Sequence, residues 1–177
     1  MSDASTSDFA HILTPPATAL VVVAAGAGTR MRSDTRKPYL LLRGRPVLFH
    51  TLERFRDLPF IRERYVIVAP EDLDLVRDRW PELCEEFGVT ALIPGGAERA
   101  NSVQAGLAAC GLVDSTIELV AIHDGVRPLV NPERVVAVCA AAHQVGAAIL
   151  ACPVSDTLKR ERGDDELPCR DHGASII

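Results

Sequence analysis

A stretch rich in small and cationic residues, AAGAGTRMRSDTRKP, follows the first apolar run of the chain. Its glycines let backbone N–H groups approach an anion closely, because a glycine has no Cβ in the way. Arg30 and Lys37, seven residues apart, can bring a fork-shaped guanidinium and a compact ammonium to one polyphosphate. A tight strand-to-helix turn with solvated charges is the alternative explanation. Glycines and cations together favour a site for a nucleoside triphosphate.

The stretch lacks the patterns of two common nucleotide loops. A dinucleotide-binding loop would have a third glycine where Met31 stands, and an acidic residue about 20 positions on, where the chain reads RPVL. A P-loop would continue with Gly-Lys-Ser or Gly-Lys-Thr, and neither follows these glycines. The sequence therefore favours phosphorus chemistry over hydride transfer, and a nicotinamide-dependent dehydrogenase is the least favoured function.

Three later segments carry polar residues suited to the rest of a nucleotide or to its acceptor. Gly95 and Ser102, in GGAERANSVQAGL, can offer backbone groups and a hydroxyl to the edge of a base. In HDGVRP, Asp124 can hold a divalent metal or a sugar hydroxyl, and Arg127 can meet a phosphate. Thr157, in PVSDTLK, can supply a hydroxyl to a polar substrate. Each segment also has a plainer explanation. The segment with Gly95 and Ser102 can be a turn with a helix cap, HDGVRP can hold a local Asp124–Arg127 ion pair, and Thr157 can belong to a helix or turn cap.

Arrangements typical of covalent catalysis or of a zinc site are missing from the sequence. It has no HExxH motif, no Ser–His–Asp arrangement and no Cys/His cluster with metal-ligand spacing. The five cysteines include no C-x-x-C pair, so we expect free thiols in a reducing cytoplasm. His123, at the end of an apolar run, is expected to be a packed strand residue rather than a catalyst.

Short apolar runs alternate with helical segments along the chain, which is the pattern of a parallel sheet covered on both faces. We expect buried strands at Ala19–Ala24, Tyr65–Ala69, Val89–Pro94, Glu118–His123 and Gly146–Cys152. Helices are expected near Pro46–Arg56, Leu73–Phe87 and Arg99–Cys110, and from an N-cap at Asn131 to Gly146. The predicted fold is doubly wound α/β with a mostly parallel sheet. Ligands of such folds lie outside the carboxyl ends of the strands, where the four segments fall.

Length and charge narrow the possibilities further. The 177 residues suffice for one domain, expected over residues 18–159, with tails at 1–17 and 160–177. A net charge of -5 argues against wrapping a nucleic acid over a basic face. Because no apolar run is long enough to span a bilayer and the N-terminus matches no secretory signal, we expect a soluble cytoplasmic protein without nucleic-acid or membrane partners.

In their order along the chain, the four motifs resemble the 2-C-methyl-D-erythritol 4-phosphate cytidylyltransferases of non-mevalonate isoprenoid biosynthesis. The motifs are AAGAGTRM with RKPYLLLRGRPVLFHT, GGAERANSVQAGL, HDGVRP, and PVSDTLK. The resemblance covers Ala19 to about Lys159. It implies a Rossmann-like nucleotidyltransferase fold, a homodimer, and the joining of CTP to the substrate phosphate with a divalent cation such as Mg²⁺. Its products would be 4-diphosphocytidyl-2-C-methyl-D-erythritol and pyrophosphate.

The resemblance also implies roles for individual residues by position. The phosphates of CTP would be cradled by Ala24, Ala25, Gly26, Gly28 and Thr29. Arg30 and Lys37 would stabilise the transition state. Other contacts to CTP would come from Gly95, Ser102, Asp124 and Gly125, with Asp124 also the metal ligand. The methylerythritol phosphate would be contacted by Asp124, Arg127 and Thr157.

The chain departs from the family pattern in two respects. Ala97 stands where members often have an acidic residue, and Gly125 and Val126 stand where they have alanines. Members also continue through a dimerisation arm, Val-Asp-Arg and Thr-Pro-Gln segments and a late lysine, so the chain resembles a truncated member. Two alternatives stay open: a cytidylyltransferase for another polyol phosphate, such as ribitol 5-phosphate, and a CTP-binding remnant without turnover.

Overall fold

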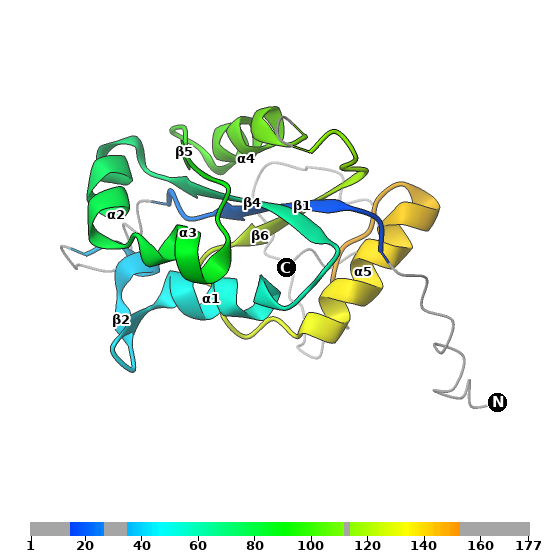
Figure 1. Cartoon of the computed structure of the whole chain (residues 1–177), viewed down its shortest axis with the longest axis horizontal. Helices are drawn as coiled ribbons and strands as arrows, with labels where there is room; N and C mark the ends of the chain where they lie inside the picture. Colours follow the sequence, from blue (N-terminus) through cyan, green and yellow to red (C-terminus); the bar gives the residue numbers. More distant parts are fainter. Residues whose placement is uncertain (1–14, 27–34, 112–113, 153–177) are drawn as a thin grey trace, which may run out of the picture.

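Residues 15–26, 35–111 and 114–152 are described by the structure, a computed structural model. Among these residues, four parallel strands form one sheet in the order β5-β4-β1-β6 (Figure 1). The strands are β1 (Thr18–Val23), β4 (Ile61–Val68), β5 (Ala91–Pro94) and β6 (Leu119–Asp124). The predicted α/β fold with a parallel sheet is therefore confirmed.

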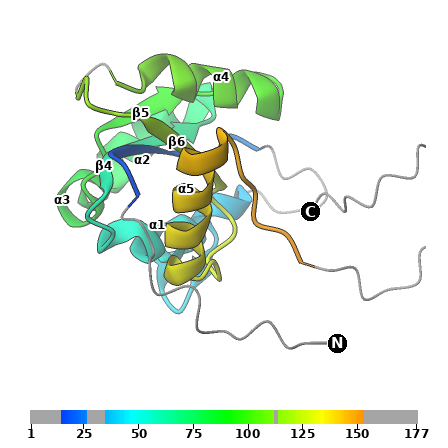
Figure 2. The ribbon, with the colours of Figure 1, turned by 90° about the vertical axis from the view of Figure 1, so that its right-hand side faces the viewer.

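Helices cover both faces of the sheet, as a doubly wound fold requires (Figures 1 and 2). They are α1 (Val47–Arg56), α2 (Leu73–Arg79), α3 (Glu82–Phe87), α4 (Arg99–Ala109) and α5 (Pro132–Val145). Helix α4 lies on one face, whereas α1, α3 and α5 lie on the other. Within the described part of the chain, no helix is long and apolar enough to cross a membrane.

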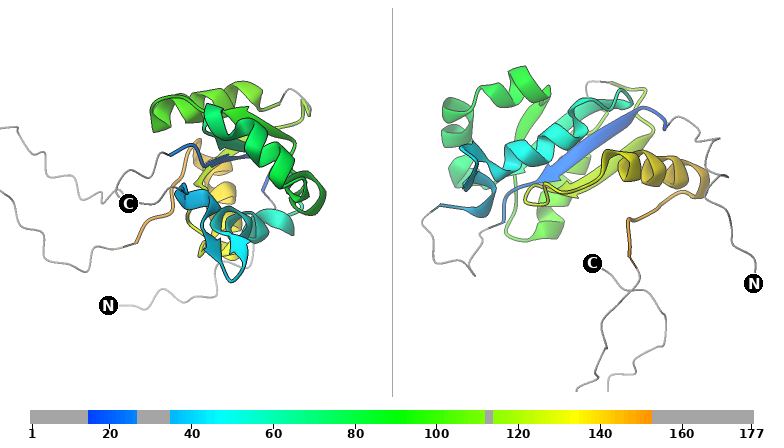
Figure 3. Two further views of the ribbon diagram at one scale, coloured as in Figure 1. Left: turned by 90° about the vertical axis from the view of Figure 1, so that its left-hand side faces the viewer. Right: turned by 90° about the horizontal axis from the view of Figure 1, so that it is seen from below.

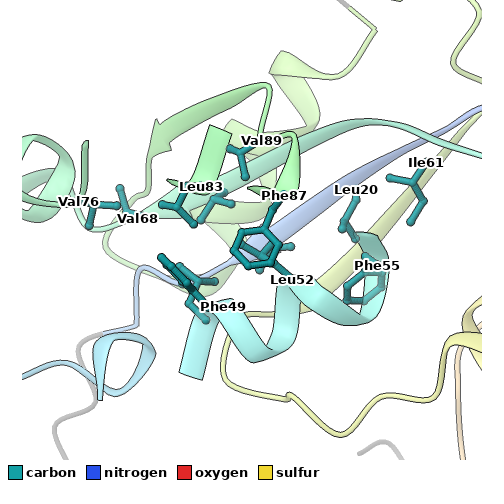
Figure 4. Packing of buried hydrophobic residues seen from close by; sticks show 14 of the residues in the cluster. Leu20, Phe49, Leu52, Phe55, Ile61, Val68, Val76, Leu83, Phe87 and Val89 are labelled. Atoms are coloured by element: carbon teal, nitrogen blue, oxygen red, sulfur yellow. The ribbon is translucent and has the colours of Figure 1, made fainter. Parts of the chain in front are cut away.

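The alternation of side chains along β1 builds two apolar clusters, one on each face of the sheet. Leu20 and Val22 are fully buried in the larger cluster, which includes residues of α5. Figure 4 shows Leu20 in this cluster with residues of α1 and α3. Ala19 and Val21 are fully buried in the smaller cluster, beneath α4. A continuous run of apolar residues, rather than an alternating one, is therefore what this central strand needs.

Short elements near the start of α1 complete one end of the molecule (Figure 3). A 3₁₀ turn, η2 (Lys37–Tyr39), leads into a small antiparallel hairpin made of β2 (Leu41–Leu42) and β3 (Arg45–Pro46). A second 3₁₀ turn, η3 (Pro70–Asp72), follows β4 directly. Both turns lie close to the carboxyl ends of the strands and, as described below, meet there.

Two of the predicted elements differ from the structure. The helix predicted over Leu73–Phe87 is two helices, because Pro81 has no N–H to continue α2 and restricts the backbone of Trp80 before it. The strand predicted at Gly146–Cys152 was wrong: its residues have no regular structure, and the side chains of Ile149 and Leu150 are 74% and 47% exposed. An apolar sequence forms a strand only where a neighbour pairs with it, and among the described residues β6 pairs with β1 alone.

The other predicted elements are present, with ends that differ by up to four residues, as where β4 begins at Ile61 rather than Tyr65. Asn131 caps α5, its side chain accepting a hydrogen bond of 2.8 Å from the backbone N–H of Glu133. Gly146 follows the helix at a positive φ of 92°, which favours glycine. The domain boundary predicted at residue 159 lies outside the described residues.

The face of α4 that meets the sheet has no room for a side chain at Gly106. A Cβ added there would lie 2.5 Å from the Cγ1 atom of Val21 and 3.2 Å from the Cδ1 atom of Ile67. Real Cβ atoms essentially never approach a neighbour to 2.5 Å, and both neighbours are fully buried. Gly106 therefore sets how close α4, with the polar residues of its first turn, lies to β1.

We expect Gly106→Ala to lower the free energy of unfolding by about 1–3 kcal/mol, the usual cost of overpacking a core. In an open helix the same change would stabilise by roughly 1 kcal/mol, so the sign of the effect tests the packing. Urea unfolding followed by circular dichroism measures it. The control is Gln104→Ala on the exposed side of α4, expected within about 0.5 kcal/mol of the unchanged protein. A Gly106→Ala protein as stable as the parent would contradict this account.

Candidate functional site

A cavity of about 540 Å³ opens at the carboxyl ends of the four strands. Its size is within the range of small-molecule sites, and its position is where open α/β sheets bind ligands. The wall is built from the backbone after β1, from η2 and η3, from the loop between β5 and α4, and from the end of β6. Three of the four motifs singled out in the sequence thus meet at one cavity.

The first wall of the cavity is the backbone that follows β1. Ala24, Ala25 and Gly26 line it, and the Ala24 N–H donates a 2.7 Å hydrogen bond to the carbonyl of Ile67 on β4. This bond continues the pairing of β1 with β4 beyond the last residue of the strand. Gly28, Thr29 and Arg30, predicted to act beside these residues, lie outside the described part of the chain.

Lys37 is the first residue of η2, which comes after that loop in the sequence, and it also lines the cavity. It makes no ion pair with any other described residue. Its neighbour Arg36, which also lines the cavity, is paired with Glu71 and, at 2.8 Å from Nε to Oδ2, with Asp72. Lys37 is therefore the cation of this wall whose charge is not balanced by a described carboxylate.

The loop between β5 and α4 approaches the first wall closely. The Gly95 N–H donates a 2.7 Å hydrogen bond to the Val68 carbonyl. A Cβ at Gly95 would lie 2.6 Å from the Cβ of Ala25 and 2.7 Å from the hydroxyl of Ser102, so only glycine fits. At Gly95 itself, the wall therefore offers only backbone groups to a ligand.

Ser102 has a structural role in the described molecule. Its side chain is 2% exposed. The hydroxyl accepts a 3.2 Å hydrogen bond from the N–H of Gly96 and donates one of 3.3 Å to the carbonyl of Glu98. Glu98 and Asn101 form a reciprocal capping box at the start of α4. The plainer explanation of this motif, a turn with a helix cap, is confirmed, although Ser102 also lines the cavity.

Asp124, the last residue of β6, is held between two arginines. Arg99 donates two hydrogen bonds to Oδ1, of 3.1 Å from Nε and 2.9 Å from Nη2. Arg127 donates one of 2.9 Å from Nε to Oδ2. Burial acts to raise the pKa of the Asp124 carboxyl, but the hydrogen bonds from the two guanidiniums outweigh it and leave the pKa below its usual value. The carboxylate is therefore ionised at neutral pH, and the predicted Asp124–Arg127 ion pair is confirmed.

Gly125 and His123 lie on either side of Asp124 in the sequence, and both pack against neighbouring elements. A Cβ on Gly125 would lie 3.1 Å from the Cβ of Ala24, and the Gly125 carbonyl accepts a 2.9 Å hydrogen bond from the hydroxyl of Thr51. The ring of His123 lies edge-on to Phe55, with centroids 4.9 Å apart. Burial lowers the pKa of His123, which keeps it neutral. The prediction that His123 is a packed strand residue is confirmed.

The side chains at the cavity limit how a metal ion could be bound there. Among the described residues, no group of three or more His, Cys, Asp or Glu side chains could hold one. Mg²⁺ commonly takes only one or two protein carboxylates and completes its shell with substrate phosphates and water. Asp124 fits that arrangement if one of its two guanidiniums moves away. Thr157, the remaining predicted contact, lies outside the described residues.

The sequence did not predict two ion pairs at the cavity, one between Arg99 and Asp124 and one between Arg36 and Glu71. Arg99 lies 25 residues from Asp124, and Arg36 lies 35 residues from Glu71. No local motif signals pairs at such separations. The carboxyl end of the second strand was also passed over, because Ala69, Pro70 and Glu71 carry no recognisable motif, although all three line the cavity.

Known proteins that are similar to this chain belong to one family. Residues 18–167 match the family model "IspD: 2-C-methyl-D-erythritol 4-phosphate cytidylyltransferase". A 2-C-methyl-D-erythritol 4-phosphate cytidylyltransferase of Syntrophus aciditrophicus is 40% identical over 152 residues, which cover 86% of this chain and 64% of that protein. One from Syntrophotalea carbinolica is 42% identical over 140 residues, covering 79% and 59%. The chain thus spans less than two thirds of the length of these relatives.

Solved structures lead to the same family. A 4-diphosphocytidyl-2C-methyl-D-erythritol synthase from Anaerococcus prevotii superposes with a TM-score of 0.59 at 28% identity, covering 73% of this chain and 52% of that one. Another crystal structure of such a synthase gives a TM-score of 0.61 at 26% identity, covering 85% and 65%. Together with the family match over most of the chain, these likenesses show that the chain belongs to the IspD family of 2-C-methyl-D-erythritol 4-phosphate cytidylyltransferases.

Proposed function

We propose that this chain is the nucleotide-binding part of an enzyme that joins CTP and 2-C-methyl-D-erythritol 4-phosphate. The products are 4-diphosphocytidyl-2-C-methyl-D-erythritol and pyrophosphate. The observation that carries the proposal is that the small residues after β1 line the same cavity as Lys37, a cation without an ion-pair partner among the described residues. The activity named for the relatives of this chain supports the choice of substrates.

In the proposed reaction, an oxygen of the acceptor phosphate monoester attacks the α-phosphorus of CTP in line with the departing pyrophosphate. One P–O bond forms as the bond between the α-phosphorus and the bridging oxygen breaks. Both reactants are anions, so the protein has to cancel charge and hold the two in line. Lys37 and Arg30 would supply that charge, with Ala24, Ala25, Gly26, Gly28 and Thr29 cradling the phosphates through backbone groups.

The remaining predicted residues take their roles from the same proposal. The backbone of Gly95 and the turn braced by Ser102 would meet the cytosine, and Gly125 brings the chain close to the ribose. Arg127 and Thr157 would contact the methylerythritol phosphate. Asp124 would share Mg²⁺ with the triphosphate, and when bound that ion adds positive charge beside the leaving group. A homodimer and a cytoplasmic location belong to this proposal as well, on the strength of the family resemblance.

We expect Lys37→Ala to lower turnover on the order of 100- to 1000-fold, the effect of losing one preorganised donor of positive charge. Arg30→Ala is expected to act similarly. Pyrophosphate release at saturating CTP and acceptor measures the loss. Arg134→Ala is the control, because it removes a positive charge from the exposed side of α5. A loss below about threefold in both cavity variants would remove the two cations from the chemistry.

Binding and turnover can be separated by calorimetry and by an acceptor series. We expect CTP with Mg²⁺ to bind in the cavity, and pyrophosphate to appear with 2-C-methyl-D-erythritol 4-phosphate. Faster release with ribitol 5-phosphate would reassign the acceptor. Binding of CTP without pyrophosphate from either acceptor would favour the binding-only alternative, and absence of binding would contradict the proposal as a whole.

A further inference from the structure

Lys37 lies in a short segment that is fixed on both sides. After it, Pro38 and Tyr39 are buried, and the ring of Tyr39 packs on that of Trp80 with centroids 5.2 Å apart. The N–H groups of Tyr39 and Leu40 donate to the carbonyls of Arg36 and Lys37, at 3.0 and 3.2 Å. Apolar packing therefore fixes the end of the segment that leads into the hairpin.

The other end is fixed by charge. The guanidinium of Arg36 pairs with both carboxylates of η3, reaching Asp72 through Nε at 2.8 Å and Glu71 through Nη2. These contacts join the segment after β1 to the carboxyl end of β4, 35 residues further along the chain. The side chains of Arg36 and Asp72 are only 23% and 15% exposed, so solvent and salt screen this pair less than a surface pair.

These contacts lie next to Lys37, and this position is what gives them a role at the cavity. Arg36 precedes Lys37 directly, and the loop with the remaining predicted phosphate contacts precedes Arg36. Without the two ion pairs, the guanidinium of Arg36 would no longer tie this end of the segment to η3 at the carboxyl end of β4. The buried Tyr39 would still hold the far end, so Lys37 would lose one of the restraints beside it.

We propose that Arg36 is a positioning residue, which holds Lys37 at the cavity wall by pairing with Glu71 and Asp72. The inference rests on the proposed function for what Lys37 binds, but not for how Lys37 is held. Arg36 also lines the cavity, so direct contact with the triphosphate is the competing role. The two roles predict different effects on CTP binding when the carboxylates of Glu71 and Asp72 are removed.

If Arg36 acts through its carboxylates, Arg36→Met and the pair Glu71→Gln with Asp72→Asn weaken CTP binding equally. We expect each to raise the Kd for CTP with Mg²⁺ about tenfold, the result of the competent conformation falling to about a tenth of the population. The triple variant is expected to be no weaker than either, because the three residues form one unit. If the carboxylate variant instead binds CTP as well as the parent or more tightly, the guanidinium touches the ligand itself and the proposal is wrong.

Arg77→Met is the matched control. Arg77 forms a 3.1 Å ion pair with Asp74 on α2, with side chains 60% and 88% exposed, and neither residue lines the cavity. An exposed pair of this kind contributes little. We expect the Kd of this variant to stay within about twofold of the parent. A rise equal to that of Arg36→Met would mean that loss of any arginine weakens binding, and would overturn the positioning role.

Hydrogen exchange tests the same inference without CTP. We expect faster exchange at the amides of Tyr39 and Leu40 in Arg36→Met, but not in Arg77→Met. Unchanged exchange in Arg36→Met would overturn the proposal even if CTP binding falls. If the parent protein fails to bind CTP, the proposed function fails, and exchange at these two amides still decides whether Arg36 holds the segment.

Discussion

The arginines beside the cavity are already ion-paired with carboxylates before a ligand arrives. Arg36 is paired with two carboxylates of η3, and Arg99 shares Asp124 with Arg127. Lys37 has no described carboxylate partner. In a chain with a net charge of -5, this division lets the protein keep arginines as structural ties and still present local positive charge to an anion. The candidate site depends on this difference between ion-paired arginines and a lysine that is available to a ligand.

Close backbone approach is the second constraint, and Gly95, Gly106 and Gly125 illustrate it. Gly95 lets the loop after β5 approach Ala25, Gly106 lets α4 rest on β1, and Gly125 lets the chain after β6 pass Ala24. Each would bring a Cβ within about 3.1 Å of a neighbouring heavy atom. Together these contacts bring polar groups from separate parts of the chain to one end of the sheet.

Features with a local cause could be predicted from the sequence. The buried strands were visible as short apolar runs, the start of α5 as Asn131 followed by Pro132, and the cavity wall after β1 as a run of small residues. Features that depend on partners far along the chain could not. The apolar run at Gly146–Cys152 looked like a strand because pattern alone does not show whether a neighbour pairs with it. The ion pairs of Arg36 and Arg99 likewise appear only once the sheet brings separate turns together.

The packing of Tyr39 on Trp80 has a practical consequence. The chain contains one tryptophan, so its fluorescence comes from a single known place. That indole touches the ring two residues after Lys37 and lies at the junction of α2 and α3. Its emission therefore reports on the environment of the segment that carries the cation, and the protein has a built-in optical probe there that needs no label.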